Sequence, residues 1–376
     1  MSLAAAVKAI ITMVGGLVTR VIAIFAFLWT AGLQGDDPLQ DGYHARAEII
    51  QAARREGHLV VYNTMHADAA LADILATFHR RYPFITIRDS DGDALKTYIR
   101  FTGETARHRP SADLIWSMAM DLQEKLINDG FALAYTSPEM PALPNWAHWQ
   151  DLGYGVTQEP IAFVYNRRFI PDARMPHTHA GLRDLLARNP ERFRGKVAMY
   201  NPAQSEVGML LMSQDVQVTR DSWNLFDTLG LVDAQLYSTS RDMLQAVLSG
   251  RQWIGYDVVA SYAMEMRKTH PELGVVYPSD YVLMLSRVAF ISATARDPNA
   301  AKLFLDFLLS REGQQKLKSY GMGPVRPDIG VPVAQARINA GRVQAIRIGP
   351  GLLADLDSLV RAQFLRRWQQ ARDTAE

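Results

Sequence analysis

The sequence contains no cysteine and carries almost no net charge. Without cysteine the chain cannot form disulfide bonds, thiolate metal sites or a cysteine nucleophile, a composition that is compatible with an oxidising compartment. Its 376 residues include 40 basic and 39 acidic side chains, which gives a formal net charge of +1. Such an even balance lacks the basic footprint that a nucleic-acid partner requires. We therefore expect no nucleic-acid partner, while a small basic pocket for an anion is compatible with this composition.

Motifs of common enzyme classes are also missing. The sequence has no H-E-x-x-H, G-x-S-x-G or G-x-x-x-x-G-K-[ST] segment. The Gly-Lys pair of FRGKVAM precedes an expected strand, whereas the glycine-rich loop of a P-loop follows one. His177 and His179 follow Met175-Pro176, so we interpret them as exposed loop histidines rather than a metal pair. We expect a protein that binds without catalysis and needs no cofactor.

The first 35 residues have the features of an export signal. Arg20 precedes an uncharged run from Val21 to Leu33, and a polar break begins at Gln34. The run has the length of a signal-peptide hydrophobic region and falls short of the ~20 residues that a membrane-spanning helix needs. No A-x-A cleavage triplet follows, so an uncleaved membrane anchor is the alternative. We predict that residues 1–35 are a signal peptide and that the protein acts in the periplasm.

Short apolar strands alternate with amphipathic helices through the rest of the chain. In the first part, strands are expected at 58–63, 84–88 and 113–116, and helices at 41–55, 69–82, 93–102 and 120–128. A second α/β segment runs from about 160 to 276, followed by an apolar run at 282–291 and helices at 299–309 and 352–369. This alternation predicts an α/β fold with largely parallel sheets, in which ligands gather beyond the carboxyl ends of the strands.

Six segments, in a fixed order between Leu59 and Pro327, resemble those of one protein family. They are LVVYNT, SADLIW, EPIAFVYNRRFI, FRGKVAMYNPAQSEVG, SRDMLQAVLSGRQWIGYDVVASYA and DPNAAKLFLDFLLSREGQQKL. On these segments the chain resembles the bacterial extracellular solute-binding proteins of the ferric-iron, phosphonate and sugar-phosphate group. The last segment, a C-terminal helix of the family, is the most specific of the six.

This resemblance implies a two-lobed type II periplasmic-binding-protein fold with two hinge crossings and a ligand cleft between the lobes. The first lobe would use residues 41–157 and 280–376, and the second lobe residues 158–279. The chain would cross near Thr157–Glu159 and again near Tyr277–Asp280. Such a protein captures a small-molecule ligand by lobe closure and presents it to the permease of an ABC importer in the inner membrane. Some relatives present the closed form to a sensor kinase instead.

Four junctions that lead into helices supply most of the candidate ligand residues. Helix N-termini offer unpaired backbone N–H groups and a partial positive charge, which suit a phosphate, phosphonate or carboxylate. The candidates are Asn63, Thr64 and His66, then Ser117 and Met118, then Gln204 and Ser205, and finally Ser238, Thr239 and Ser240. Because Ser, Thr and Asn are also the standard capping residues, the alternative is that these residues only cap helices.

Four further residues have both a binding and a structural interpretation. Tyr256 and Asp257 end a strand that should face the cleft, and Tyr281 belongs to the second crossing. A tyrosine there could give a ligand an aromatic wall and a hydroxyl group, or could simply pack. Arg287 lies in an apolar run, so it either forms a structural ion pair, which we favour, or binds an anion.

Ferric ion is the alternative ligand. Fe³⁺ prefers tyrosinate and carboxylate oxygens, and ferric-binding relatives typically carry two adjacent tyrosines where this chain reads Asp257 to Tyr262. Only Tyr262 is present in that segment, and no Tyr-Tyr pair occurs in the sequence. A metal site would have to combine His66, Glu159, Tyr256 and Tyr262. We therefore favour an organic or phosphorylated anion and expect no metal.

Overall fold

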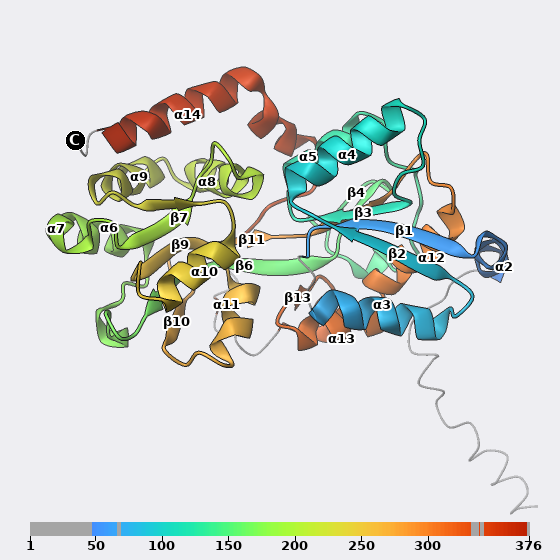
Figure 1. The fold of residues 1–376 in the computed structure, drawn as a ribbon, viewed down its shortest axis with the longest axis horizontal. Coiled ribbons are helices and arrows are strands. Elements are labelled where there is room, and N and C mark those ends of the chain that lie inside the picture. The colour runs from blue at the N-terminus through green and yellow to red at the C-terminus, as the bar shows by residue number, and fades with distance from the viewer. Residues whose placement is uncertain (1–46, 66–68, 332–337, 339–341, 374–376) are drawn as a thin grey trace, which may run out of the picture. The chain divides into compact units, whose positions relative to one another are not determined.

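Two β-sheets organise the part of the chain that the structure describes (Figure 1). This computed structural model describes residues 47–65, 69–331, 338 and 342–373. They belong to one unit, His44–Glu376. The predicted signal peptide and His66 lie outside the described residues. None of the helices described has both the length and the apolar composition that crossing a membrane requires.

The first sheet has six strands in the order β2-β1-β3-β12-β5-β4. These strands are β1 (His58–Asn63), β2 (Thr86–Asp91), β3 (Leu114–Ser117), β4 (His148–Trp149), β5 (Gly153–Gly155) and β12 (Val288–Ile291). With this sheet, the following helices form what we call the first lobe: α2 (Ala47–Glu56), α3 (Ala69–Arg81), α4 (Ala94–Ala106), α5 (Met120–Asn128), α12 (Pro298–Leu309) and α13 (Arg311–Ser319). β1 pairs in parallel with β2 and β3, because a helix carries the chain back before each new strand.

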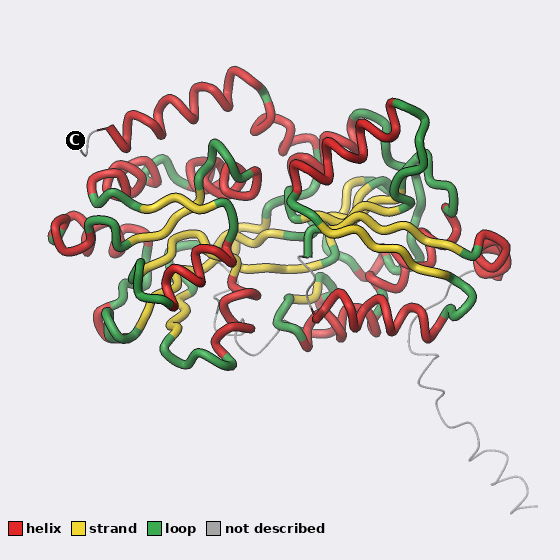
Figure 2. Tube along the Cα trace, viewed as in Figure 1, coloured by secondary structure: helices red, strands yellow, loops and turns green. Residues whose placement is uncertain are grey.

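The second sheet follows the path β14-β11-β6-β9-β7-β8, and β10 also pairs with β6. Its strands are β6 (Thr157–Asn166), β7 (Val197–Tyr200), β8 (Gln235–Tyr237), β9 (Ile254–Val259), β10 (Leu273–Val276), β11 (Val282–Leu285) and β14 (Val343–Ala345). The helices of this second lobe are α6 (His179–Arg188), α7 (Pro190–Phe193), α8 (Glu206–Val218), α9 (Ser222–Leu231), α10 (Ser240–Leu248), α11 (Ala260–Arg267) and α14 (Ser358–Asp373). Figure 2 shows helices on either side of the strands in both lobes. The predicted α/β class is confirmed.

Aromatic side chains fill the cores of both lobes. Phe78 of α3 packs edge-on against Phe304 of α12, with ring centres 5.0 Å apart. In the second lobe, Phe163 of β6 lies 5.8 Å from Tyr256 of β9, and Tyr256 lies 6.3 Å from Phe226 of α9. All five side chains are buried. The apolar periodicity that predicts these helices and strands therefore also supplies the contacts that hold them against the sheets.

Two segments connect the sheets. The first is Val156, which joins Gly155 at the end of β5 in the first sheet to Thr157 at the start of β6 in the second. Thr157 also pairs with β13 (Gly323–Pro324), a short strand of the second sheet. The second is the pair Ser286-Arg287, which joins β11 of the second sheet to β12 of the first. This crossing lies later in the chain than the predicted 277–280. The reason is that two buried polar residues divide the apolar run 282–291 into two strands of different sheets.

The C-terminal segment returns to the second lobe. β14 pairs in parallel with β11, and the 3₁₀ helix η6 (Pro350–Leu356) packs against both α5 and α8. Figure 1 shows α14 lying over α8 and α9, and an ion pair between Arg367 and Asp227 at 2.7 Å holds α14 to α9. The expectation that residues 280–376 all join the first lobe does not hold for this segment, because its Trp368 completes the second-lobe core.

Gly230 of α9 lies where α14 makes a very close approach. A Cβ at this position would be 2.0 Å from the carbonyl oxygen of Ala371, so Gly230→Ala should displace the end of α14. We expect the variant to lose about 1–3 kcal/mol of unfolding free energy, the usual cost of overpacking. Urea denaturation measures this loss, and limited proteolysis should show earlier cleavage of α14. Gly351→Ala is the control, because nothing lies within 4 Å of its added Cβ. Equal stability of the two variants would contradict the prediction.

Candidate functional site

A cavity of about 430 Å³ lies between the two lobes. Its volume falls within the range of about 300–1,000 Å³ that small-molecule sites occupy. We call it the interlobe cavity. The first lobe lines it with Thr64, Asp93, Ala94, Leu95, Lys96, Ile99 and Met118. The second lobe lines it with Tyr200, Gln204, Ser205, Glu206, Val207, Ser238, Thr239, Ser240, Arg241 and Tyr262. A smaller cavity of about 180 Å³ shares the last two residues.

The structure brings together many of the residues that the sequence proposes as ligand contacts. Those in the wall of the interlobe cavity are Thr64, Met118, Gln204, Ser205, Ser238, Thr239 and Ser240. Asn63 and Ser117 are buried and do not line it. Their side chains serve the backbone instead: Asn63 Oδ1 accepts from the N–H of Met65 at 3.0 Å, and Ser117 Oγ accepts from the N–H of Ala119 at 3.3 Å. The ends of β1 and β3 thus meet the starts of α8 and α10 at one place, as α/β sheets predict.

Three other candidates lie in the core of the second lobe and not at the cavity. Tyr256 donates to Asp215 of α8 at 2.5 Å, and Tyr281 donates to the other oxygen of the same carboxylate at 2.8 Å. Tyr256 and Asp257 are fully buried. The expected position of Tyr256 facing the cleft is not observed. Its ring lies on the face of β9 that α8 and α9 cover, where α8 supplies its hydrogen-bond acceptor.

Two of the candidate hydroxyl groups cap helices. Ser205 Oγ accepts from the N–H of Gly208 at 3.2 Å at the start of α8. Thr239 Oγ1 accepts from the N–H of Asp242 at 3.1 Å at the start of α10. The capping alternative therefore holds for these two side chains. What the two junctions offer a ligand is the remaining backbone N–H groups of the first turns and the positive ends of the helix dipoles.

Arg241 gives the interlobe cavity a positive charge that no carboxylate of the described residues neutralises. The carboxylates in the wall are already paired, Asp93 with Lys96 at 2.8 Å and Glu206 with Arg361 at 2.7 Å. No carboxylate of the described residues lies within ion-pair distance of Arg241, whose guanidinium lies 5.6 Å from the ring centre of Tyr262. Since Arg241 is in the first turn of α10, its charge adds to the positive end of that helix.

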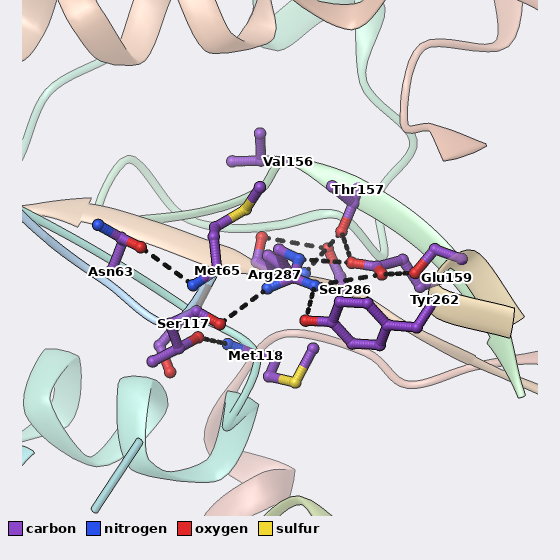
Figure 3. Close-up of polar contacts among 12 residues, drawn as sticks. Asn63, Met65, Ser117, Met118, Val156, Thr157, Glu159, Tyr262, Ser286 and Arg287 are labelled. Carbon is purple, nitrogen blue, oxygen red and sulfur yellow. Dashed lines mark hydrogen bonds and ion pairs between the residues drawn. The ribbon is translucent and has the colours of Figure 1, made fainter. Parts of the chain in front are cut away.

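A buried ion pair lies at the two crossings (Figure 3). Arg287 is 1% exposed and donates through Nε to Glu159 Oε1 at 2.7 Å, and Glu159 is 0% exposed. The hydroxyls of Thr157 and Ser261 donate to the two oxygens of the same carboxylate, at 3.0 Å and 2.5 Å. The buried negative charge is thus both neutralised and hydrogen-bonded, as burial of a charge requires.

The guanidinium of Arg287 also reaches both lobes. Its Nη1 donates to the backbone carbonyl of Thr64 in the first lobe at 3.3 Å, and its Nη2 donates to the hydroxyl of Tyr262 on α11 at 2.8 Å. Thr64 and Tyr262 both line the interlobe cavity. The geometry of Arg287 matches the structural interpretation, and it adds that the ion pair connects the crossings to cavity residues of both lobes.

Comparison with known proteins shows which family has this architecture. Residues 59–323 match the family described as bacterial extracellular solute-binding protein. The chain belongs to this family. This solute-binding protein is also similar to the substrate-binding protein of the ABC transporter from Agrobacterium tumefaciens, with 31% identity and a TM-score of 0.78. That alignment covers 84% of this chain and 94% of the other. A search of curated proteins gave no match.

More distant structures share the fold of this solute-binding protein. Two of them are iron-bound HitA from Pseudomonas aeruginosa and the periplasmic binding protein AfuA from Actinobacillus pleuropneumoniae with fructose-6-phosphate bound. Each is 18% identical, with a TM-score of 0.67, and each alignment covers 84% of this chain and 99% of the other. The resemblance and the two-lobed fold inferred from the sequence are confirmed. Family membership implies a small-molecule ligand and an ABC permease as partners.

Among the described residues of the ferric alternative, Glu159 and Tyr262 lie together, but around an arginine, and Tyr256 lies elsewhere. Glu159 is neutralised by Arg287, which also donates to the hydroxyl of Tyr262. Tyr256 lies in the second-lobe core, and His66 lies outside the described residues. The described part of the chain holds no cluster of three or more His, Asp or Glu side chains placed to bind a metal ion. Two of the four residues, Glu159 and Tyr262, instead bind the guanidinium of Arg287.

Asp215 is a buried acid that sequence reasoning missed. Burial and the charge of Asp215 raise the pKa values of Tyr256 and Tyr281 well above the usual value for a tyrosine. Asp257 has φ of 59°, in the left-handed region, and burial next to Asp215 raises the pKa of its carboxyl. The local sequence gives little signal of this burial, because Asp215 lies in the polar end, SQDVQV, of the segment EVGMLLMSQDVQV. A buried acid must find donors inside the protein, and the two tyrosines provide them.

Proposed function

We propose that this solute-binding protein captures a small organic anion between its lobes and delivers it to an ABC permease. Arg241 carries the proposal, because it is a cation in the cavity wall with no carboxylate partner among the described residues. The first turns of α8 and α10 border the same cavity through Ser205 and Thr239. Two positive helix ends and one guanidinium thus converge, which suits a phosphate, phosphonate or carboxylate.

Binding between the lobes provides a physical basis for delivery. Thr64 of the first lobe and Arg241 of the second line one cavity, so a ligand that contacts both gains interactions as the lobes approach. A ligand that binds the closed state more tightly shifts the population towards that state. The permease can then distinguish the loaded protein by its shape. No bond of the ligand is made or broken in these steps.

We place this activity in the periplasm. The support is the family, whose members are extracellular, together with the apolar segment of residues 1–35. Removal of that segment by a signal peptidase and its retention as an anchor both leave the binding unit outside the inner membrane. The comparisons give no support to a sensor kinase as partner, so the permease is the partner that we propose.

Arg241→Ala is expected to weaken the binding of an anionic ligand about 10–100-fold, since a hydrogen bond to a charged group contributes about 1.5–3 kcal/mol. Ligands would first be found by thermal shift among inorganic phosphate, phenylphosphonate, a sugar phosphate and citrate, because a bound ligand raises the Tm. Isothermal titration calorimetry then gives the affinities. Arg251→Ala, on the surface of the second lobe and outside the cavity, should bind like the parent. A neutral solute or ferric ion that bound equally to the parent and to Arg241→Ala would overturn the assignment of an anion.

A further inference from the structure

We propose that the ligand of the interlobe cavity is an amphipathic organic anion whose apolar body packs against α4 of the first lobe. This inference rests on the proposed function and adds the chemistry of the rest of the ligand. Its basis is a difference between the two walls of the cavity. The second-lobe wall carries Arg241 and several hydroxyl groups, whereas the first-lobe wall has large apolar side chains beside Thr64 and the Asp93–Lys96 ion pair.

Leu95 and Ile99 are large aliphatic side chains that the protein itself does not cover. Leu95 is 42% exposed and Ile99 is 58% exposed, and both line the interlobe cavity. They are four residues apart in α4, so their side chains share one face of the helix. Met118, after β3, adds a third apolar side chain to this wall. Neighbouring exposed apolar side chains at a cavity mark a place where another apolar surface binds.

The two charged groups beside these side chains pair with each other. Lys96 pairs with Asp93 at 2.8 Å, and Asp93 also accepts from the N–H of Lys96 as the N-cap of α4. Leu95 and Ile99 themselves offer no donor or acceptor to the hydroxyl groups of a sugar, and a polar group buried against them without a partner would be unfavourable. An alkyl or aryl group would instead gain affinity, by about fourfold for each methylene that it buries.

The size of the cavity agrees with a ligand of two parts. Inorganic phosphate would occupy only a small fraction of about 430 Å³. With the anionic group at Arg241, the space beside Leu95 and Ile99 is left for a carbon body. The second lobe would then recognise the charge and the first lobe the apolar body. Only a ligand with both parts makes the full set of contacts across the cavity, and this requirement would select such a ligand over an inorganic anion.

Two pairs of probe ligands test this inference by isothermal titration calorimetry on the full chain. They are methylphosphonate with phenylphosphonate, and acetate with phenylacetate. The members of each pair share the anionic group and differ in the apolar body. In the pair that binds, we expect the aromatic member to bind at least about tenfold more tightly, the scale of discrimination that an apolar contact gives.

Variants separate the two walls. A double variant, Leu95→Ser with Ile99→Ser, should reduce that ratio to roughly one- to threefold and leave the affinity for the small member unchanged. Arg241→Ala should weaken both members and leave the ratio unchanged. Leu359→Ser is the matched control, because Leu359 is 61% exposed on α14 and does not line the cavity.

The outcomes distinguish this inference from the proposed function. Equal affinities for both members of a pair, each weakened in Arg241→Ala, would refute the apolar body and leave the proposed function standing. Binding of citrate or the sugar phosphate through Arg241, with no binding in either pair, would also refute the apolar body and leave the proposed function standing. No binding of any of these anions, or binding that Arg241→Ala does not change, would refute the proposed function itself. If the Leu95→Ser/Ile99→Ser variant kept both affinities and lost only transport with its permease, the aliphatic pair would be a permease contact and the inference would be wrong.

Discussion

Arg287→Met is expected to lower the free energy of unfolding by about 3–5 kcal/mol, because it leaves a buried carboxylate without its counter-charge. Glu159 is 0% exposed, and its oxygens lie 2.7 Å and 3.4 Å from the nitrogens of Arg287. Methionine fills a similar volume but donates no hydrogen bond. The remaining donors, Thr157 and Ser261, are neutral and cannot replace the positive charge. The substitution also removes the hydrogen bond that the hydroxyl of Tyr262 accepts from Arg287.

Urea denaturation followed by circular dichroism measures this effect. Adding Glu159→Gln to Arg287→Met removes the buried charge, so the double variant should regain a large part of the lost stability. Arg194→Met serves as the control, since Arg194 pairs with Glu191 at the surface and its loss should leave stability unchanged. Unfolding of Arg287→Met at the same urea concentration as the parent would show that the ion pair is dispensable.

Asp121→Asn is expected to stabilise the protein at pH 8, by roughly 2–4 kcal/mol. Asp121 lies on α5 at 0% exposure, and its Oδ2 has no hydrogen-bond partner among the described residues. Burial, and then the charges of Glu206 and Asp355, raise the pKa of Asp121 to about 7. Above that pH the native protein must hold an uncompensated negative charge, which asparagine does not carry.

The direction of the pH dependence follows from the raised pKa of Asp121. The unfolded chain releases this proton near the ordinary value of 3.8, whereas the native protein keeps it until about pH 7. The native state therefore binds more protons in that window, and stability falls as the pH rises through it. Below about pH 4 the buried carboxyl of Asp121 is protonated and does not lower the free energy of unfolding, whereas above about pH 7 it is ionised and lowers it fully. The stability of Asp121→Asn relative to the parent should rise across this window and then level off.

Urea denaturation at pH 5, 6, 7 and 8 tests this expectation. Glu124, one turn further along α5, is also buried, and burial raises its pKa to about 7 as well. Adding Glu124→Gln should therefore flatten the pH dependence further. Asp129→Asn is the control, because Asp129 lies at the surface and pairs with Lys125 at 2.6 Å. Parallel stability curves for the parent and Asp121→Asn would contradict the prediction.

β1 and α5 show how far local sequence determines structure here. The expected bounds, 58–63 and 120–128, are those observed. β1 is a short apolar run after Gly57, and α5 ends just before Gly130, where both glycines have positive φ. The spacing of apolar residues in a segment indicates whether it forms a helix or a strand, and the neighbouring glycine indicates where that element begins or ends. A different local signal, the capping residues Ser and Thr, located the starts of α8 and α10, and with them many of the residues that line the interlobe cavity.

Partners that are distant in sequence could not be predicted in this way. Tyr256 is expected to end its strand, but β9 continues to Val259, and the acceptor that fixes the direction of the Tyr256 ring is Asp215, 41 residues earlier. The charge of Arg241 stands out only once Glu206 is seen to pair with Arg361, 155 residues away. The exposure of Leu95 and Ile99 likewise depends on what the other lobe leaves uncovered. These features come from tertiary packing, which the spacing of apolar residues along the sequence does not reveal.

The return of the C-terminal segment has a consequence for the order of synthesis. The first lobe needs α12 and α13, and the second lobe needs β14 and α14, so neither lobe is contiguous in the chain. A domain made of one continuous segment can fold as soon as that segment leaves the ribosome. Here a nascent chain that still lacks residues 343–373 leaves one edge of β11 unpaired and the apolar side of α9 uncovered. Complete folding of the second lobe therefore has to wait until its last helix has been made.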